Sequence, residues 1–532
     1  MRETEFFNDI SEIKRFIKAQ TETVRLLESR INSLEADKSS LQEEVKRLRS
    51  CLYGRKTEKT SALDINQHLL FCAAEDWLAK PPASEYEEDE VVVRKRKRRK
   101  RNFFHPDLPV RKKIIDIPEE EKMCACGCMK KNIGVEKSLR AGYTPASAWL
   151  LETNRLKYAC PNCYGEDGEG PAVTIAPLPP RILGKSILSE ELAAHLVVSK
   201  FADALPFYRQ EAILRRIGLE ISRATMAPNL IRVAEQLFPL QQLIEKRLLD
   251  STCIGIDETP LQVMNEPGRS NTSLSYMWHF VAHTRDGPLP YFLYRETRSP
   301  KFLNTFLLEY QGPVVTDGYP AYNKFGETPG LIHAGCNAHA RRKFVDAEKI
   351  AAGTPETAQI ILLYRRIYAI EKDLKEARAT AEVVLEQRQL RTKPLMAELR
   401  EILDVLAAGI TPESIRGKAV FYALEEWTKL IRFLDDPLIP IDNNEVERGI
   451  RPFTLGRKNW LFANTPRGAH ATALFYTLME WTKICGLNPY LYMLHLFENA
   501  GAAVTENDWE ALLPCNIQPD SGTGAERQYA VS

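Results

Sequence analysis

The chain has 532 residues and a mass of 60.6 kDa, which exceeds one ordinary hydrophobic core, so we expect three or four domains. Hydrophobic residues make up 44% and charged residues 27%, as in globular proteins, and the net charge of +1 indicates no partner by itself. No uncharged apolar run reaches the ~20 residues of a membrane helix, and the first residues lack a signal-peptide apolar block. We therefore expect a cytoplasmic protein that is neither membrane-bound nor secreted.

Residues 10–52 follow a heptad repeat in which eleven of the thirteen a and d positions are apolar. Ile or Val at a with Leu at d favours a parallel two-stranded coiled coil, so we predict that residues 1–53 make a homodimer or a higher oligomer. The alternative is a helix lying on the protein's own core, which needs a wider apolar stripe than this narrow seam.

Residues 54–115 have the composition of a linker. An acidic cluster is followed by eight consecutive cations, Arg94 to Arg101, which cannot pack into a core. Such a run either contacts a polyanion such as a nucleic acid backbone or is a solvated segment.

Five cysteines between residues 124 and 163 indicate metal binding rather than disulfides, since eleven cysteines occur in a chain without an export signal. Two cysteine pairs separated by a predicted strand pair, Ser147 to Tyr158, are typical of a zinc ribbon, so we predict such a domain over residues 116–170. The alternatives are that Cys128 replaces one ligand of the first pair or that the cysteines are buried without a metal. The predicted structural Zn²⁺ ligands are Cys124, Cys126, Cys160 and Cys163.

Residues 180–245 predict amphipathic helices over 189–200, 205–217 and 221–233, with Gly218 in a turn. This is the outline of a helix-turn-helix, although any small helical bundle has the same pattern and Pro228 disfavours a regular recognition helix.

Two acids follow short apolar runs. Asp257 comes after residues 253–256 and Asp317 after residues 312–316, with two more strand-like runs, 274–280 and 289–294, between them. Carboxylates where strands end are how an α/β sheet presents metal ligands at one edge, and a carboxylate pair can hold two Mg²⁺ ions for phosphoryl transfer. The alternative is that both aspartates only begin turns.

A third acid, Glu447, lies among cations, which suits a metal site that also holds a phosphate backbone. The alternative is a surface salt bridge with neighbouring arginines. A second basic cluster surrounds His339, whose role is either structural or in DNA contact. The predicted DNA contacts are Arg341, Arg342, Arg448, Arg451, Arg457 and Lys458. Residues 345–436 predict only helices, an all-α insertion between the second and third acids.

Taken in order, these motifs resemble the transposases of the bacterial insertion sequence sixty-six family, and the resemblance runs almost end to end. Asn337 departs from the family's usual aromatic before the His339 motif. The motifs that carry the resemblance are Leu52–Lys59, Lys157–Cys163, Leu205–Gln210, Asp257–Pro260, Asp317–Tyr319, Ala338–Phe344, Asp442–Asn444 with Glu447-Arg448, and Gly456–Phe462.

The resemblance implies a DDE enzyme with an α/β RNase H-like core over residues 246–485, interrupted by the helical insertion and followed by a carboxyl-terminal tail, 486–532. It implies that Asp257, Asp317 and Glu447 are the catalytic acids and hold two Mg²⁺ or Mn²⁺ ions. Water would cut the element's ends, and the freed 3′-hydroxyls would then attack target DNA. The partners implied are the terminal inverted repeats, target DNA and small accessory transposition proteins, with residues 180–245 binding DNA.

Two other classes fit parts of the pattern. A non-catalytic, dimeric, zinc-containing DNA-binding regulator derived from a transposase would keep the zipper, the cysteines and the basic run, but would not need all three acids. A metal nuclease would explain the acids and the cations, but not the zipper, the cysteine cluster or the insertion.

Overall fold

The computed structural model describes residues 147–159, 173–325, 328–350 and 354–517, and positions 18, 20–25, 27, 30, 38 and 45 near the amino terminus. These amino-terminal positions are helical and exposed. Most of the heptad seam, the basic run and all five clustered cysteines lie outside the described residues. The coiled coil, the linker and the zinc ribbon therefore stay predictions.

A mixed sheet with the strand order β5-β4-β3-β6-β7 forms the centre of the fold. β3 is antiparallel to β4 and parallel to β6, β4 is antiparallel to β5, and β6 is parallel to β7. The short β8 runs parallel to the far end of β3. The strands are β3 (Cys253–Val263), β4 (Leu274–Thr284), β5 (Gly287–Arg295), β6 (Gly312–Thr316), β7 (Leu331–Gly335) and β8 (Phe462–Ala463).

Helices cover both faces of the sheet, because successive strand side chains alternate between faces. On one face the ring centroids of His279 and Phe292 lie 4.3 Å apart, and those of Phe292 and Phe453 of α16 lie 6.3 Å apart. On the other face Phe280 lies 5.3 Å from Phe306 of α7. The first face carries α15 (Asn444–Gly449), α16 (Arg451–Trp460) and α17 (Pro466–Ile484), and the second carries α6 (Phe238–Leu249), the 3₁₀ turn Pro300–Phe302, α7 (Leu303–Phe306) and α8 (Tyr322–Phe325).

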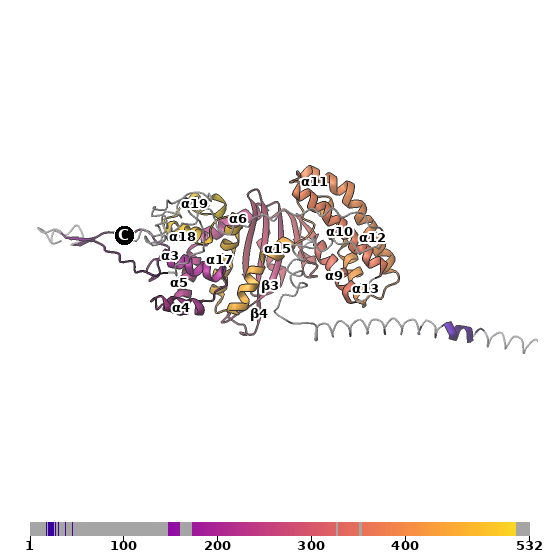
Figure 1. Cartoon of the computed structure of the whole chain (residues 1–532), viewed down its shortest axis with the longest axis horizontal. Coiled ribbons are helices and arrows are strands. Elements are labelled where there is room, and N and C mark those ends of the chain that lie inside the picture. Colours follow the sequence, from indigo (N-terminus) through magenta and orange to yellow (C-terminus); the bar gives the residue numbers. More distant parts are fainter. Residues whose placement is uncertain are drawn as a thin grey trace, which may run out of the picture. The chain divides into compact units, whose positions relative to one another are not determined.

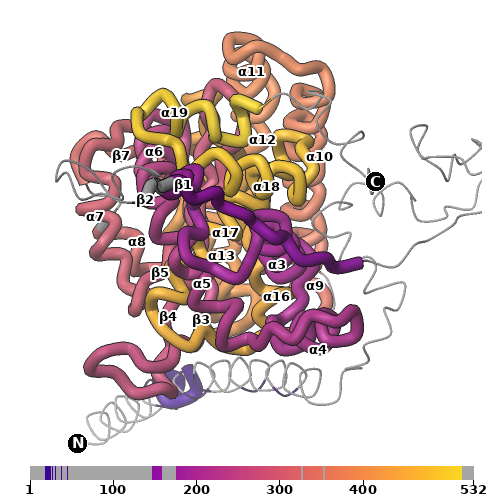
Figure 2. Tube along the Cα trace, turned by 90° about the vertical axis from the view of Figure 1, so that its left-hand side faces the viewer, coloured from indigo at the N-terminus to yellow at the C-terminus, as the bar shows by residue number. Residues whose placement is uncertain are grey.

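The helices before the sheet share one hydrophobic core with those at the end of the described chain. α3 packs against α17 and α18, and α6 packs against α19 (Figure 2). Residues 486–517, expected to belong to a tail, instead form helices in this core, because their apolar side chains cover α3 and α6. These helices are α3 (Glu190–Phe201), α4 (Phe207–Arg216), α5 (Arg223–Gln236), α18 (Pro489–Ala500) and α19 (Glu506–Ala511), with a 3₁₀ turn at Pro514–Asn516.

Pro228 lies inside α5, which begins after Ser222, so this proline does not end the helix. None of the helices in the described ranges is long and apolar enough to cross a membrane.

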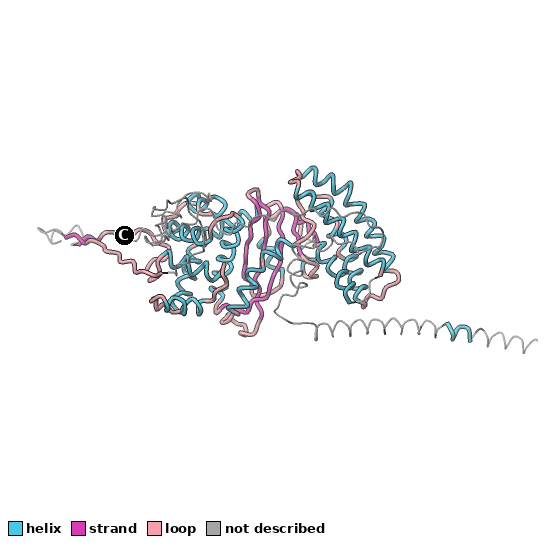
Figure 3. Tube along the Cα trace, in the orientation of Figure 1, coloured by secondary structure: helices cyan, strands magenta, loops and turns pink. Residues whose placement is uncertain are grey.

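Between β7 and β8 every described element is helical, and these helices have a second core of their own (Figures 1 and 3). The elements that come before α15 are α9 (Asn337–Ile350), α10 (Pro355–Glu376), α11 (Ala381–Gln387), a π-helical turn (Arg388–Thr392), α12 (Lys393–Ala407), α13 (Ile415–Glu425), α14 (Trp427–Leu430) and a 3₁₀ turn (Arg432–Leu434). Figure 1 shows α10, α12 and α13 together on one side of the sheet.

The strand pair predicted within Ser147–Tyr158 is wrong. Residues 147–156 form no strand, and β1 (Lys157–Ala159) pairs antiparallel with β2 (Val173–Ile175). The partner strand of β1 thus follows the second cysteine pair in the sequence.

A buried arginine, Arg388, links the first long helix of the insertion to its last segment. The Nη1 of Arg388 donates to the carbonyls of Phe433, Asp436 and Ile439 at 2.7, 3.0 and 3.0 Å. Its Nε and Nη2 donate to the Glu371 carboxylate at 2.9 and 2.7 Å. The guanidinium therefore ties α10 to the segment that leads back to the sheet.

We predict that Arg388→Ala lowers the free energy of unfolding by about 3–5 kcal/mol, because it leaves a buried carboxylate and three carbonyls without their donor. The matched control is Arg400→Ala, which removes an exposed pair with Asp404 on α12 and should cost less than about 0.5 kcal/mol. Thermal and urea unfolding of both variants measure this. Equal losses would contradict the role assigned to Arg388.

Candidate active site

β3 and β6 bring Asp257 and Asp317 onto neighbouring strands. The last parallel pair, Gly255 with Val315, lies two residues before each aspartate. Asp317 follows the end of β6 as predicted, but Asp257 does not end its strand, since β3 continues to Val263. β3 is longer than predicted because β4 pairs with it along nearly its whole length.

Glu447 is held over these strands by the close docking of α15 on the sheet. The Asn443 amide donates to the carbonyl of Ile256 at 2.8 Å, one residue before Asp257. A Cβ at Gly255 would lie only 2.4 Å from Val446 Cγ2, so glycine is what allows this approach. A large part of the chain separates Glu447 from β3, and these contacts fix its position.

His279 of the neighbouring strand β4 also contacts α15. Its Nδ1 donates to the Val446 carbonyl at 3.1 Å, and a Cβ at Gly449 would lie 2.3 Å from its ring. The ring is completely buried, and burial lowers the pKa of His279 to about 3, so the imidazole is neutral. The sequence prediction gave His279 and Gly255 no role, and it included Asn443 only as part of the Asp442–Asn444 motif. That motif and Gly449, a helix-disfavouring residue just after the third acid, were the local signals.

The three predicted acids interact electrostatically. Burial raises the pKa of Asp257 to about 8, and the charges of Glu258, Glu447 and Asp317 add to this effect. One Asp257 oxygen accepts the Glu258 backbone N–H at 2.9 Å, which opposes the shift only in part. The ionised form of Asp257 is thus destabilised by burial and by the neighbouring carboxylates.

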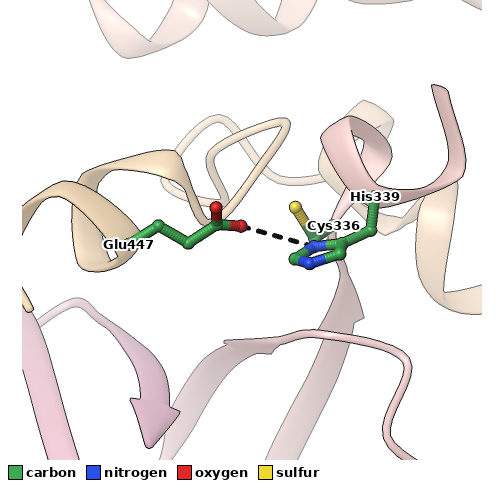
Figure 4. Close-up of side chains that lie close together, drawn as sticks. All are labelled: Cys336, His339 and Glu447. Carbon is green, nitrogen blue, oxygen red and sulfur yellow. Dashed lines mark ion pairs between the residues drawn. The ribbon is translucent and has the colours of Figure 1, made fainter. Parts of the chain in front are cut away.

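Glu447 differs, because a guanidinium and an imidazole lie beside it. Its Oε2 accepts from Arg342 at 3.2 Å, and its Oε1 lies 3.5 Å from His339 Nδ1 (Figure 4). Arg342, predicted as a DNA contact, therefore binds the third acid in this structure. Arg341 lies 5.9 Å from the ring of Tyr368.

The remaining predicted DNA contacts lie on α15 and α16. Arg457 donates to the Thr259 hydroxyl at 2.9 Å and to the Pro260 carbonyl, so it also fastens α16 to β3. Arg448 and Lys458 are exposed and Arg451 is half-buried.

Glu258, beside Asp257, belongs to a separate network. Arg298 donates to its carboxylate at 2.6 Å, and the Tyr322 hydroxyl donates to its other oxygen. Arg298 also lies 3.9 Å from the Tyr319 ring centroid, just after Asp317. The Glu258 charge is therefore already neutralised, unlike that of its neighbour, and the sequence analysis assigned Glu258 no role.

The insertion reaches the Asp317 loop through Tyr422 of α13. A Cβ at Gly318 would lie 2.3 Å from the Tyr422 hydroxyl oxygen, so the ring packs directly on the backbone after Asp317. Lys343 of α9 lies 4.3 Å from the centroid of the same ring. The insertion thus contacts the backbone immediately after one of the three acids.

The carboxylates fit divalent cations. Oxygen ligands are those that Mg²⁺ prefers, and the raised pKa of Asp257 indicates a site where added positive charge would be stabilising. Among the described residues, however, the group of three ligand atoms that lie within 4.8 Å of one another is Cys336, His339 and Glu447. Glu447 thus lies between two potential metal sites.

We predict that Gly255→Ala destabilises the protein by about 1–3 kcal/mol, because the new methyl would overlap Val446 and Asn443. Gly409→Ala is the control, since its Cβ would meet no atom within 4 Å. Thermal unfolding compares the two. An unchanged melting temperature for Gly255→Ala would show that α15 can move away at no cost.

The raised pKa of Asp257 also predicts a pH dependence. Because this pKa lies above the ordinary value of ~3.9, the folded state binds more protons than the unfolded chain between these values. The corresponding stability is complete below about pH 4 and is lost as the pH rises toward 8. In EDTA we expect Asp257→Asn to be more stable than wild type by roughly 1–2 kcal/mol at pH 8, with a smaller difference at pH 5. Thermal unfolding across this range tests it, and a variant less stable at pH 8 would refute it.

Comparisons with known proteins identify the family of the chain. The model of the family described as Transposase IS66 family matches residues 185–471, and a model described as Transposase C of IS166 homeodomain matches residues 40–112. The uncharacterized protein y4jD of Sinorhizobium fredii is 33% identical over 496 residues, covering 90% of this chain and 95% of the relative. The uncharacterized protein y4qI of the same organism is 32% identical over 435 residues, covering 79% and 78%. The chain therefore belongs to the IS66 family of transposases.

Proposed function

We propose that this protein is a DDE transposase that cuts the ends of its insertion sequence and joins the freed 3′-hydroxyl ends to target DNA. The observation that carries the proposal is the placement of Asp257 and Asp317 two residues beyond a paired position of adjacent parallel strands, with α15 docked on the same strand. Burial and Glu258 raise the pKa of Asp257 to about 8, and Glu447 and Asp317 add to this shift. The sheet order, with one acid on the central strand and one after its parallel neighbour, supports an RNase H-like core.

Asp257 and Asp317 would hold two Mg²⁺ or Mn²⁺ ions, with Glu447 completing the set of ligands. When bound, such ions supply positive charge to the attacking and the leaving oxygens of a phosphodiester.

The protein's own residues would position the DNA strands. Arg448, Arg451 and Lys458 lie on α15 and α16 beside Glu447, where they would bind backbone phosphates. Arg457 would act mainly by keeping α16 on β3, as its bonds to Thr259 and Pro260 indicate. Arg342 would hold the Glu447 carboxylate and contact DNA at its exposed side.

The remaining parts would assemble the complex. A coiled coil over residues 1–53 would bring two protomers to the two ends of the element, and the cysteines between 124 and 163 would bind structural Zn²⁺. Helices α3–α5 would contribute to recognition of the terminal repeats. Small accessory transposition proteins belong to this proposal as partners.

Two observations favour this function over its alternatives. A DNA-binding regulator would not need Asp257 to be kept in an unfavourable electrostatic setting, which costs stability. A simple nuclease would not need the long insertion that packs Tyr422 against the Asp317 loop. Joining of DNA ends, rather than cutting alone, separates the transposase from the nuclease.

We predict that Asp317→Asn and Glu447→Gln each reduce end cleavage and strand transfer by on the order of 10²–10³-fold, because each removes one metal-binding carboxylate. Both variants should still bind DNA ends in a gel-shift assay. The substrate is DNA that carries the ends flanking the protein's own gene, with Mg²⁺ or Mn²⁺ present.

The matched control is Glu445→Gln. Glu445 lies on α15 two residues before Glu447, is exposed, and faces His283 at 3.7 Å. This variant should join DNA ends as wild type does. Equal losses in Glu445→Gln and Glu447→Gln would contradict the specific role of Glu447, and binding without any joining, even with accessory proteins added, would favour the regulator.

A further inference from the structure

Three metal-ligand side chains from two elements converge beside the proposed active site (Figure 4). Cys336 lies between β7 and α9 and is buried, and His339 follows in the first turn of α9. Glu447 approaches them from α15. One ligand atom of each side chain lies within 4.8 Å of the other two.

The imidazole and the carboxylate face each other without a normal hydrogen bond. His339 Nδ1 and Glu447 Oε1 are both buried, neither has a hydrogen-bond partner among the described residues, and they lie 3.5 Å apart. That separation is longer than the usual 2.7–3.2 Å of an N–H···O bond. It matches the roughly 3.4 Å between two ligands that each lie ~2.0–2.1 Å from one tetrahedral cation.

The sulfur ligand, Cys336 Sγ, indicates which kind of cation this site would prefer. Cys336 Sγ accepts the backbone N–H of Asn443 at 3.2 Å, a contact that stabilises a metal-bound thiolate. A thiolate and an imidazole favour Zn²⁺ over Mg²⁺, which prefers oxygen ligands alone. Without a cation Cys336 is a thiol, since burial raises its pKa, so binding would release one proton.

We propose that Cys336, His339 and Glu447 bind a thiophilic divalent cation such as Zn²⁺, with a fourth position open to water. A bound zinc ion engages Glu447 and withdraws it from Asp257 and Asp317. Zinc at this site therefore inhibits Mg²⁺-dependent DNA cleavage. This inhibitory effect rests on the proposed function, whereas the binding of zinc does not.

The first test measures binding to the full-length protein, freed of metal with a chelator and then titrated with Zn²⁺ or Co²⁺. The clustered cysteines between 124 and 163 would bind zinc too, so the readout is the difference from variants. Wild type should bind about one equivalent more than Cys336→Ser or His339→Ala, and the difference should appear in the cobalt–thiolate absorption. Cys485→Ser, which changes a half-buried cysteine on another helix end, is the control and should bind as wild type does.

Variants that fail to fold are identified by their melting temperatures without metal, and Glu447→Gln then serves as a second test. It should weaken the additional zinc equivalent at least tenfold while leaving the cobalt–thiolate absorption of the cysteine cluster unchanged. Equal stoichiometry and affinity in wild type and all folded variants would overturn the proposal and leave His339 as a residue that only orients Glu447.

The second test compares end cleavage with and without Zn²⁺ at fixed Mg²⁺. Zinc should inhibit wild type, and the ratio of the two rates should return toward one in Cys336→Ser. If zinc binds but leaves cleavage by wild type unchanged, the inhibitory role is wrong. If no cleavage occurs under any condition, the proposed function fails while the binding result still decides the metal site.

Discussion

The candidate site depends on one contact, the docking of α15 on the central strand. Glycine at position 255 lets Val446 approach the sheet, and the Asn443 amide bonds to the Ile256 carbonyl beside Asp257. From β4, His279 holds the Val446 carbonyl. Glu447 is thereby fixed by backbone and side-chain bonds on both sides, and a different packing here would remove the third acid from the other two.

Hydrogen bonds from the insertion fix the segment 430–441, which leads from the insertion to α15. The amide of Asn337, at the start of α9, donates to the carbonyls of Leu430 and Ile441 at 2.9 and 3.2 Å. Arg388 holds the carbonyls between these two positions from inside the insertion. The two hydrogens of the Asn337 amide nitrogen thus satisfy two carbonyls of this segment. These bonds thus fix the position of the backbone that leads into α15.

Local sequence patterns predicted the acids but not their neighbours. Asp257 and Asp317 were predicted because each follows an apolar run. A buried strand with a polar residue after it is a pattern of only a few consecutive residues. The extension of β3 was missed, since the apolar run ends at Asp257 and the next residues include Pro260. Pro260 lies between the residues that pair with β6 and those that pair with β8, where a proline is tolerated.

The missed elements depend on contacts between distant residues. β7 was not predicted because Leu331–Gly335 is short and contains His333, whose burial depends on a bond to Thr316 at 2.8 Å. The roles of Gly255 and His279 likewise depend on their contacts with Val446 of α15, which is distant in the sequence. No periodicity in the sequence indicates that a helix far along the chain will pack on a particular glycine.

The three acids are not equivalent, and this asymmetry has a chemical consequence. Glu447 has Arg342 and His339 of α9 beside it, whereas Asp257 is half-buried beside other carboxylates and holds a proton up to about pH 8. A cation that binds Asp257 would replace that proton, while a cation that binds Glu447 would replace its contact with Arg342. Under the proposed function, Glu447 would join Asp257 and Asp317 only after its contact with Arg342 is rearranged. The α9 side of the site can thus control whether the third acid is available.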